Sequence, residues 1–205
     1  MSESMAVTYY KEKAFDIAEN VYEPAEDTFL LADNLDVHKG ERVLELGTGC
    51  GLLAILAANA GAEVVATDIN PAALRCARAN AVKHRVEDRI DFRLGDLFEP
   101  VAGERFDLAI FNPPYLPVEP EEALCGPLDR AWEAGPDGRR IIDRFLRELS
   151  NHLTPNGRVL FVQSSLANIS KTLRVLETSG FKVNTIHKKL PFEELFLLRC
   201  FIAPK

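Results

Sequence analysis

Five short apolar runs that alternate with helix-forming stretches constrain the fold of this chain more than any other feature. The runs occupy residues 42–46, 63–67, 90–94, 106–111 and 158–163. The stretches that favour helices occupy residues 52–59, 72–84, 138–153 and 167–179, and the segment Thr-Pro-Asn-Gly at 154–157 favours a turn. Alternation of this kind is typical of βαβ units arranged around a parallel sheet.

Two further runs, 181–187 and 195–202, end the chain with a connection too short to hold a helix. Parallel neighbours need a crossover of about a dozen residues or more, so this last pair should be antiparallel. The 205 residues therefore predict one α/β domain with a Rossmann-like, seven-stranded, mostly parallel sheet and an antiparallel C-terminal hairpin. Residues 42–205 would form its core, and residues 1–41 an N-terminal lid and helix segment.

A glycine cluster follows the first run. The glycines Gly47, Gly49 and Gly51 alternate with Thr48 and Cys50. Glycine lets a backbone turn sharply and come close to a ligand, here at the carboxyl edge of the sheet where open α/β folds bind. The spacing GxGxG differs from the GxGxxG of dinucleotide-binding proteins. Two residues before the first glycine, Glu45 is placed to pair with the ammonium group of a bound methionine moiety. Proteins that bind NAD, FAD or S-adenosyl-L-methionine (AdoMet) all place glycines here, and the spacing together with Glu45 favours AdoMet, with S-adenosyl-L-homocysteine as the product.

Acidic residues follow the second and third runs. Asp68, with Ile69 beside it, ends the second run, where a carboxylate can accept hydrogen bonds from ribose hydroxyls. Its alternative role is to cap the helix that opens at Pro71, for which Asn70 is the better candidate. After the third run, Asp96 is placed to accept from the adenine amine and Leu97 to cover the ring, although Asp96 also suits an ordinary turn.

The motif Asn112-Pro113-Pro114-Tyr115 follows the fourth run directly. Methyl transfer to a planar nitrogen is difficult because its lone pair is delocalised. A site that accepts hydrogen bonds from both N–H groups fixes the nitrogen and favours its pyramidalisation, and the Asn112 side-chain oxygen and the Pro113 carbonyl suit that task. The prolines stiffen the loop, so little entropy is lost on binding, and Tyr115 offers a flat face for stacking. We expect these four residues to be catalytic through orientation rather than through a strong base.

The bulk properties of the chain narrow its class. The net charge of −7 disfavours nucleic acid as the main partner, because proteins that grip phosphates usually carry a basic face. No apolar run approaches the roughly 20 residues of a membrane span, and the first residues lack the apolar core of a signal peptide, so a cytoplasmic protein is expected. The four cysteines and four histidines are scattered, which predicts neither a disulfide framework nor a metal site.

The motifs at 45–51 and 112–115 resemble those of the HemK/PrmC family of protein glutamine methyltransferases. The segment 21–31 is similar to the archaeal and eukaryotic branch, which modifies class I translation termination factors, and so are Ala131-Trp132, residues 135–139 and residues 142–145. The likeness spans about residues 20–201. Where relatives often carry two glycines, this chain has Gly135-Pro136, which would stiffen the loop.

This resemblance implies a class I AdoMet-dependent methyltransferase whose acceptor is the glutamine amide of a GGQ motif in a release factor. It implies a lid made by Tyr22, Glu23 and Pro24, and a small zinc-binding activator subunit at the sheet edge, which residues 90–94 should form. Asp91 and Arg93 on that strand also suit ordinary solvent-facing charges. The cofactor positions that match the family are Thr28, Glu45, Gly47, Asp68, Asp96, Leu97 and Asn112.

Two alternatives remain open at this point. The same motif serves enzymes that methylate exocyclic amines of adenine or guanine in RNA or DNA, but Glu119, Glu121 and Glu122 after the motif would repel phosphates and suit a basic protein loop. Four arginines, at positions 139, 140, 144 and 147, form either a solvated face or a contact surface. A non-catalytic AdoMet-binding subunit is the second alternative. Such subunits typically lose the motif at 112–115, which we call the acceptor motif and which is intact here.

Overall fold

The computed structural model describes residues 6–117 and 134–202. The chain forms two compact units, Met1–Ala102 and Gly103–Lys205. The predicted residues Glu119, Glu121, Glu122 and the segment Ala131-Trp132 lie outside the described residues.

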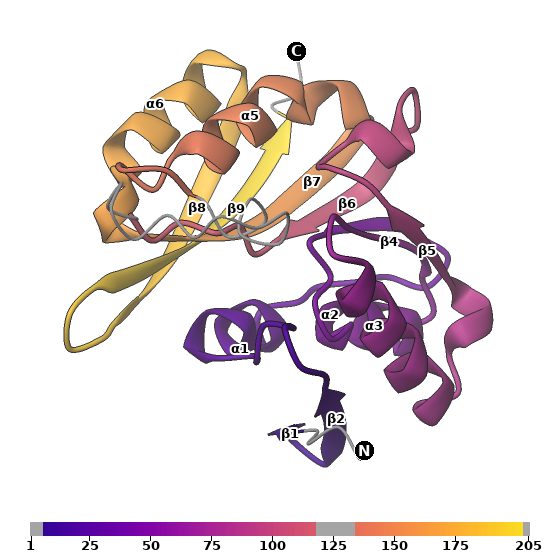
Figure 1. Cartoon of the computed structure of the whole chain (residues 1–205). Coiled ribbons are helices and arrows are strands. Elements are labelled where there is room, and N and C mark those ends of the chain that lie inside the picture. The colour runs from indigo at the N-terminus through magenta and orange to yellow at the C-terminus, as the bar shows by residue number, and fades with distance from the viewer. Residues whose placement is uncertain (1–5, 118–133, 203–205) are drawn as a thin grey trace. The chain divides into compact units, whose positions relative to one another are not determined.

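The first unit is built on three parallel strands with helices against them. The strands are β3 (Arg42–Leu46), β4 (Glu63–Asp68) and β5 (Ile90–Leu94), with Val43 opposite Val64 and Val64 opposite Ile90. The helices are α1 (Glu26–Asp33), α2 (Leu52–Asn59) and α3 (Pro71–Lys83), with 3-10 turns at Glu87–Arg89 and Glu99–Val101. Figure 1 shows α2 and α3 side by side beneath β4 and β5. As predicted, Asn70 caps α3: its side-chain oxygen accepts from the Ala72 N–H at 2.9 Å, and Pro71 follows the cap.

An N-terminal hairpin, which the sequence did not predict, precedes these elements. Its strands, β1 (Ala6–Tyr10) and β2 (Lys13–Ile17), pair antiparallel through the two-residue turn Lys11-Glu12. Lys11 has a φ of 53°, a left-handed conformation that glycine or asparagine usually supplies in such turns. The turn therefore lacks the residues by which a hairpin is recognised.

Asn80 on α3 fastens this hairpin to the glycine cluster. Its fully buried side chain accepts from the Asp16 N–H at 2.9 Å and donates to the carbonyls of Asp16 at 2.8 Å and Cys50 at 2.9 Å. The Cys76 thiol also donates to the Asp16 carbonyl, and Lys83 forms an ion pair with the Asp16 carboxylate at 2.7 Å. One amide side chain thus satisfies backbone groups from two segments far apart in the sequence.

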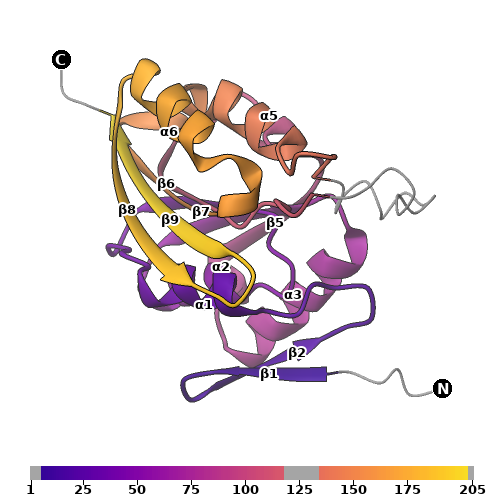
Figure 2. The same ribbon diagram turned by 90° about the vertical axis from the view of Figure 1, so that its left-hand side faces the viewer.

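The second unit holds four strands and two helices among its described residues. The strands are β6 (Phe106–Phe111), β7 (Leu153–Ser164), β8 (Phe181–Lys189) and β9 (Glu194–Ile202). The helices are α5 (Arg140–Glu148) and α6 (Ile169–Thr178), with 3-10 turns at Leu149–His152 and Ser165–Ala167. Figures 1 and 2 both show α5 and α6 side by side on one face of these strands. Phe145 of α5 packs between Phe111 and Phe161, at ring-centroid distances of 4.9 and 5.5 Å, and so anchors the helix to the sheet.

Two segments of the second unit differ most from the sequence prediction, while the other bounds differ by one or two residues. The segment predicted as a turn at 154–157 belongs to β7, where the partners shift from Phe106–Leu153 to Leu108–Arg158. The segment therefore forms a bulge within the strand, and a Cβ at Gly157 would lie 2.9 Å from the Phe106 carbonyl. The helix predicted over 138–153 is α5 alone, and its last predicted residues form the 3-10 turn and the start of β7.

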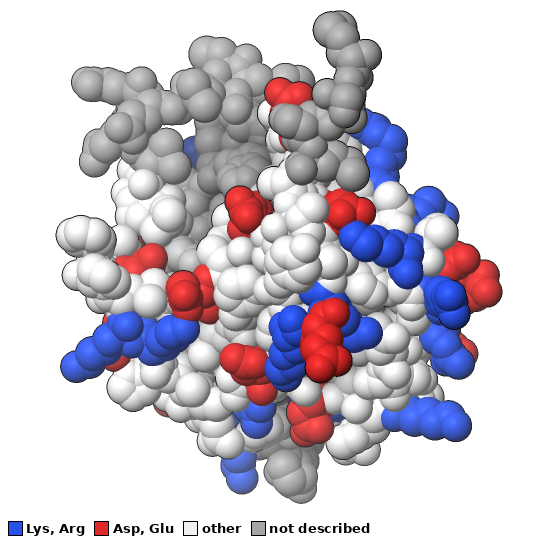
Figure 3. All heavy atoms as spheres, turned by 90° about the horizontal axis from the view of Figure 1, so that it is seen from below, with Lys and Arg blue, Asp and Glu red and all other residues white. Residues whose placement is uncertain are grey.

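The main sheet has the strand order β5-β4-β3-β6-β7-β9-β8, and β9 pairs antiparallel with both β7 and β8. This confirms the predicted seven-stranded, mostly parallel sheet with antiparallel C-terminal strands, and it makes β5 an edge strand as expected. On the face shown in Figure 3, the described Lys and Arg side chains are interspersed with Asp and Glu rather than gathered into one basic field. Among the described residues, no helix is both long and apolar enough to cross a membrane.

Asn80→Ala should lower the free energy of unfolding by about 3 kcal/mol, because the Asp16 N–H and the Cys50 carbonyl lose their side-chain partner and the Asp16 carbonyl keeps only the Cys76 thiol. Urea unfolding measures this loss. The control is Asn151→Ala, which removes an exposed amide and should change stability by no more than about 0.5 kcal/mol. Equal stability of Asn80→Ala and the wild type would show that the hairpin is held by other contacts.

Candidate active site

The glycine cluster after β3 forms a tight turn into α2. The backbone φ angles of Gly47, Gly49 and Gly51 are 63°, 55° and 86°, in the left-handed region that residues other than glycine rarely adopt. A Cβ at Gly51 would lie 2.9 Å from the Ala77 Cβ, so this position also needs glycine for α2 and α3 to pack. The turn is tied to β4 by the Thr48 N–H, which donates to the Thr67 carbonyl at 2.9 Å.

Glu45 is buried beneath this turn, with 3% of its surface exposed. Its Oε2 accepts from the Thr48 hydroxyl at 2.6 Å and from the Ala54 N–H in the first turn of α2 at 3.0 Å. Burial raises the pKa of the Glu45 carboxyl to about 8; the bonds from Thr48 and Ala54 oppose this rise, and the nearby Asp68 adds to it. A cationic group placed beside this carboxyl would favour its ionised form.

Asp68, at the end of β4, joins the glycine turn to the loop that enters α3. Its Oδ2 accepts from the Gly49 N–H at 2.9 Å and its Oδ1 from the Asn70 N–H at 2.8 Å. Burial raises the pKa of Asp68, and these backbone bonds oppose the shift. The structure thus brings Glu45, the glycine turn and Asp68 together, with the half-exposed Ile69 beside them.

The loop after β5 begins beside the carboxyl end of β4, since the Gly95 N–H donates to the Asp68 carbonyl at 3.0 Å. Asp96 and Leu97 are partly buried. Leu97 has a φ of 46°, which is unusual for a branched side chain, and such strain is often found at binding sites. A Cβ at Gly95 would overlap the Pro100 ring, so the loop is also tightly packed.

The predicted lid segment is fixed to the first unit by polar contacts. Asn70 donates from its side chain to the Asn20 carbonyl at 2.8 Å, which ties the segment to the loop after Asp68. Glu23 accepts from the Thr8 hydroxyl of the hairpin at 2.8 Å, and Pro24 is buried. The sequence indicates Asn70 only as a helix cap, and nothing in its sequence context signals this second bond.

Asp27 is a second residue that sequence reasoning missed. Its carboxylate is 5% exposed and accepts from the Tyr22 hydroxyl at 3.0 Å and the Thr28 hydroxyl at 3.2 Å. It therefore orients Tyr22 and Thr28, two of the three residues that the sequence predicted for cofactor binding in this segment. An acidic residue in the first turn of a helix is so common that its position gave no signal of this role.

The acceptor motif belongs to the second unit and follows β6 without a break. Pro113 and Tyr115 are buried, and Asn112 and Pro114 are partly buried. The Asn112 Oδ1 atom is buried with no donor within hydrogen-bond distance among the described residues, although Asn112 takes part in other interactions. Tyr115 is only 8% exposed, so stacking of an acceptor on its ring would require that face to become accessible.

The arginine group predicted as one solvated or contact face is divided. Arg147 is exposed, but Arg139 is 2% exposed and bonds within the second unit, so the prediction is wrong for Arg139. The Arg139 guanidinium is buried because it pairs with Asp143 at 2.7 Å and also donates to groups of residues 167, 168 and 172, which are close only in the folded chain. Among the described residues, no three His, Cys, Asp or Glu side chains converge as metal ligands would.

Replacement of Glu45 by glutamine should flatten the pH dependence of stability. The Glu45 carboxyl ionises near its usual pKa of 4.5 in the unfolded chain but near 8 in the folded protein. Folding then binds a proton between these values, so wild-type stability falls as pH rises through this window. Glu45→Gln removes that contribution, which urea unfolding at several pH values would show as a less negative slope. The exposed Glu177, replaced in the same way, should leave the slope unchanged, and an unchanged slope in Glu45→Gln would contradict the raised pKa.

The chain is similar to known methyltransferases. The Methyltransferase small domain family matches residues 23–122. MJ0928 of Methanocaldococcus jannaschii, named for protein N5-glutamine methyltransferase activity, is 45% identical over 183 residues, which are 88% of this chain and 91% of that protein. Human methyltransferase HEMK2 is 36% identical over 177 residues, which are 81% of this chain and 82% of that protein.

A solved structure shares the fold along nearly the whole chain. The Mtq2–Trm112 complex of E. cuniculi, described as responsible for methylation of the eRF1 translation termination factor, matches with a TM-score of 0.70 and 25% identity. The match covers 90% of this chain and 99% of that one. The fold of the chain thus agrees with that of this solved structure. The chain belongs to the HEMK2/Mtq2 family of AdoMet-dependent protein N5-glutamine methyltransferases.

Proposed function

We propose that this enzyme methylates the glutamine side-chain amide of the GGQ motif in a class I translation termination factor. The observation that carries the proposal is the position of Asn112-Pro113-Pro114-Tyr115, directly after β6, in a chain that is 45% identical to a relative named for N5-glutamine methyltransferase activity. The description of the Mtq2–Trm112 complex, which names eRF1, supports the choice of substrate.

The first unit would hold AdoMet, which supplies the activated methyl group when bound. Glu45 fits the ammonium group, because its buried carboxyl is poised to ionise beside a cation. Asp68 fits the ribose hydroxyls, and Asp96 with Leu97 fits the adenine. Gly47, Thr48, Gly49 and Gly51 would line the methionine moiety, and the segment that contains Tyr22, Pro24 and Thr28 would cover the cofactor, with Ile69 at its edge.

The second unit would hold the acceptor. The Asn112 Oδ1 and the Pro113 carbonyl would accept from the two N–H groups of the glutamine amide, which orients its nitrogen lone pair toward the methyl group. The proton leaves readily once nitrogen carries a fourth substituent, so no strong base is required. Asn112, Pro113, Pro114 and Tyr115 would therefore act by orientation.

A small zinc-binding subunit is the proposed partner, in line with the Mtq2–Trm112 complex. The edge strand β5 is its proposed docking place, because exposed edges tend to be covered. Near this edge, Arg42, Glu63, Asp88, Arg89, Asp91 and Arg93 are among the residues that line a hollow of about 610 Å³. Arg93 pairs with Asp91 at 2.8 Å and donates to the Pro100 carbonyl, so these charges also satisfy each other as ordinary surface residues do.

Transfer of labelled methyl from AdoMet to an archaeal or eukaryotic-type release factor tests the proposal. We expect label on the wild-type factor and none on a GGA version, with a higher rate when the zinc-binding subunit is present. Label on an RNA or DNA control but not on the factor would overturn the glutamine proposal and assign the motif to a nucleobase amine. Equal rates with and without the subunit would count against the partner alone.

Asn112→Ala should reduce turnover by at least about a hundredfold, because the amide nitrogen loses one of its two orienting acceptors. The Kd for AdoMet should stay within about tenfold of the wild-type value, since the other proposed cofactor residues are untouched. Single-turnover kinetics and calorimetric titration measure the two quantities. A variant that keeps its fold and its turnover would refute the role of Asn112.

A further inference from the structure

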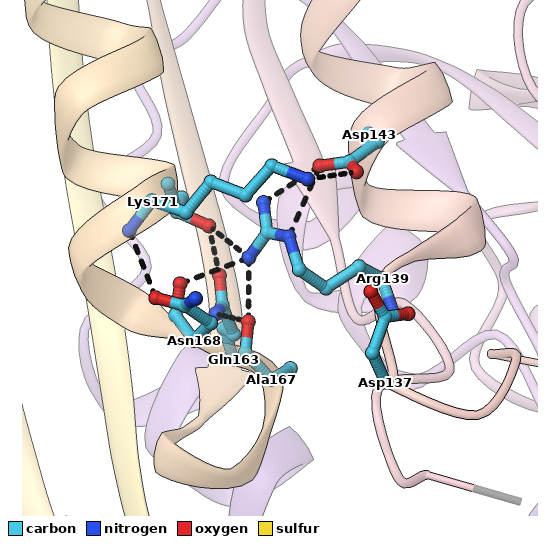
Figure 4. A network of polar contacts seen from close by, with 8 residues as sticks. Asp137, Arg139, Asp143, Gln163, Ala167, Asn168 and Lys171 are labelled. Carbon is cyan, nitrogen blue, oxygen red and sulfur yellow. Dashed lines mark hydrogen bonds and ion pairs between the residues drawn. The ribbon is translucent and has the colours of Figure 1, made fainter.

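Among the described residues of the second unit, Arg139 is the most buried charged side chain. It immediately precedes α5 and is 2% exposed. Its Nε and Nη2 donate to the Asp143 carboxylate at 3.1 and 2.7 Å, and its Nη1 donates to the carbonyls of Ala167 and Asn168 and to the Thr172 hydroxyl. Figure 4 shows this guanidinium bridging the start of α5 and the start of α6.

The network extends from Arg139 to the end of β7. The Thr172 hydroxyl donates to the Gln163 Oε1 at 2.7 Å, and the Gln163 Nε2 donates to the Ala167 carbonyl at 2.7 Å. Gln163 is fully buried. Because β6 and β7 are parallel, with Phe111 opposite Phe161, Gln163 lies at the carboxyl end of these strands, where the acceptor motif begins.

A second contact leads from Arg139 to the acceptor motif itself. The neighbouring Gly138 has a φ of 69°, and a Cβ built on it would overlap the Tyr115 carbonyl oxygen and lie 3.1 Å from the Ala167 Cβ. The backbone of Gly138 is therefore sandwiched between Tyr115 and the turn before α6. No other residue fits there without moving one of them.

The turn that carries Gly138 is held on both sides. The Arg140 N–H donates to the Ala134 carbonyl at 2.8 Å and the Gly138 N–H to the Gly135 carbonyl at 3.1 Å. The Arg139 N–H donates to the Asp137 side chain at 3.1 Å. Since the Arg139 side chain binds Ala167 and Asn168, it sets the position of this turn relative to α6, and hence the surface against which Tyr115 rests.

A net gain in stability is a weak explanation for this arrangement. A buried ion pair must overcome the loss of hydration of both ions, and well-packed apolar residues often stabilise a core equally well. A planar guanidinium with five fixed donors is instead suited to holding several acceptors in one geometry. The Asp143 carboxylate is itself held by Lys171 at 2.7 Å, so the guanidinium has a fixed counterion.

We propose that Arg139 is a positioning residue for methyl transfer, which fixes the Asn112–Tyr115 motif through Gly138. The proposal rests on the proposed function of that motif. Arg139 touches neither acceptor nor cofactor in this role. Its loss would leave the acceptor amide bound but misdirected, so it should lower kcat rather than the affinity for AdoMet.

Arg139→Lys is the principal test, because lysine keeps the charge but cannot bridge Asp143, Ala167 and Thr172 together. We expect kcat to fall about ten- to hundredfold, as displacements near 1 Å do in other enzymes. The Kd for AdoMet should change by less than about threefold. Gly138→Ala, which leaves Arg139 intact but places a methyl group against the Tyr115 carbonyl, should give the same pattern.

Two controls separate positioning from general loss of structure. Arg147→Lys makes the same replacement at an exposed arginine on α5 and should leave kcat unchanged. Leu176→Ala removes a buried side chain of α6, 1% exposed, that none of the contacts above involve, and should lower Tm without a selective loss of kcat. The falls in kcat of Arg139→Lys and Leu176→Ala are compared at the same Tm. If the two falls are equal, Arg139 has only a structural role and the proposal fails.

Hydrogen exchange supplies a readout that needs no acceptor. The backbone amides of Tyr115 and Leu116 should exchange faster in Arg139→Lys than in Arg147→Lys or Leu176→Ala, because the contact with Gly138 loosens. Unchanged exchange together with wild-type kcat would overturn the proposal. A wild-type enzyme that methylates no release factor would refute the proposed function instead, and the exchange measurement would still decide whether Arg139 positions the motif.

Discussion

The capture of backbone N–H groups by two buried carboxyl groups is the interaction on which the first unit depends. Glu45 holds the start of α2 and the Thr48 hydroxyl, while Asp68 holds the Gly49 and Asn70 N–H groups. A glycine turn has little intrinsic preference for one conformation, so it needs such partners to become ordered. The same carboxyl groups are the proposed ligands of AdoMet, and their burial raises both pKa values. The elements that shape the turn thus also leave it receptive to a cation and to hydroxyl donors.

The second unit uses a cation for the corresponding purpose. Arg139 binds the carbonyls of Ala167 and Asn168, which no carboxylate could do, and so joins segments that are separated by almost thirty residues. Phe145 adds an apolar anchor on the same helix by packing between Phe111 and Phe161. The hydrogen bonds of Arg139 and the packing of Phe145 therefore both orient α5. The acceptor motif directly follows β6, the strand that carries Phe111.

Most of the fold could be predicted because buried parallel strands such as β3 and β6 read as mainly apolar runs, and both have the bounds expected for them. The edge strand β5 also has its expected bounds. The hairpin at Ala6–Ile17 could not, because its turn lacks glycine and asparagine. The bulge in β7 could not, because Pro155 and Gly157 also signal a turn. For the candidate site, motifs singled out Glu45, Asp68 and Asn112, but they gave no sign that Asp27 binds the Tyr22 hydroxyl. The sequence alone misplaces Arg139, because its partners at 167, 168 and 172 are close only in the folded chain.

The site contacts that the sequence did not predict, those of Asn70, Asp27 and Arg139, have one physical feature in common, and it bears on catalysis. Motifs report residues that would touch a ligand, whereas Asn70, Asp27 and Arg139 touch the residues or turns that support that contact. A reaction that needs no strong base relies on orientation, and orientation depends on how firmly the contacting residues are held. Holding them before the ligand arrives also reduces the entropy lost on binding. The catalytic capacity of such a site therefore depends as much on its buried hydrogen bonds as on the motif that identifies it.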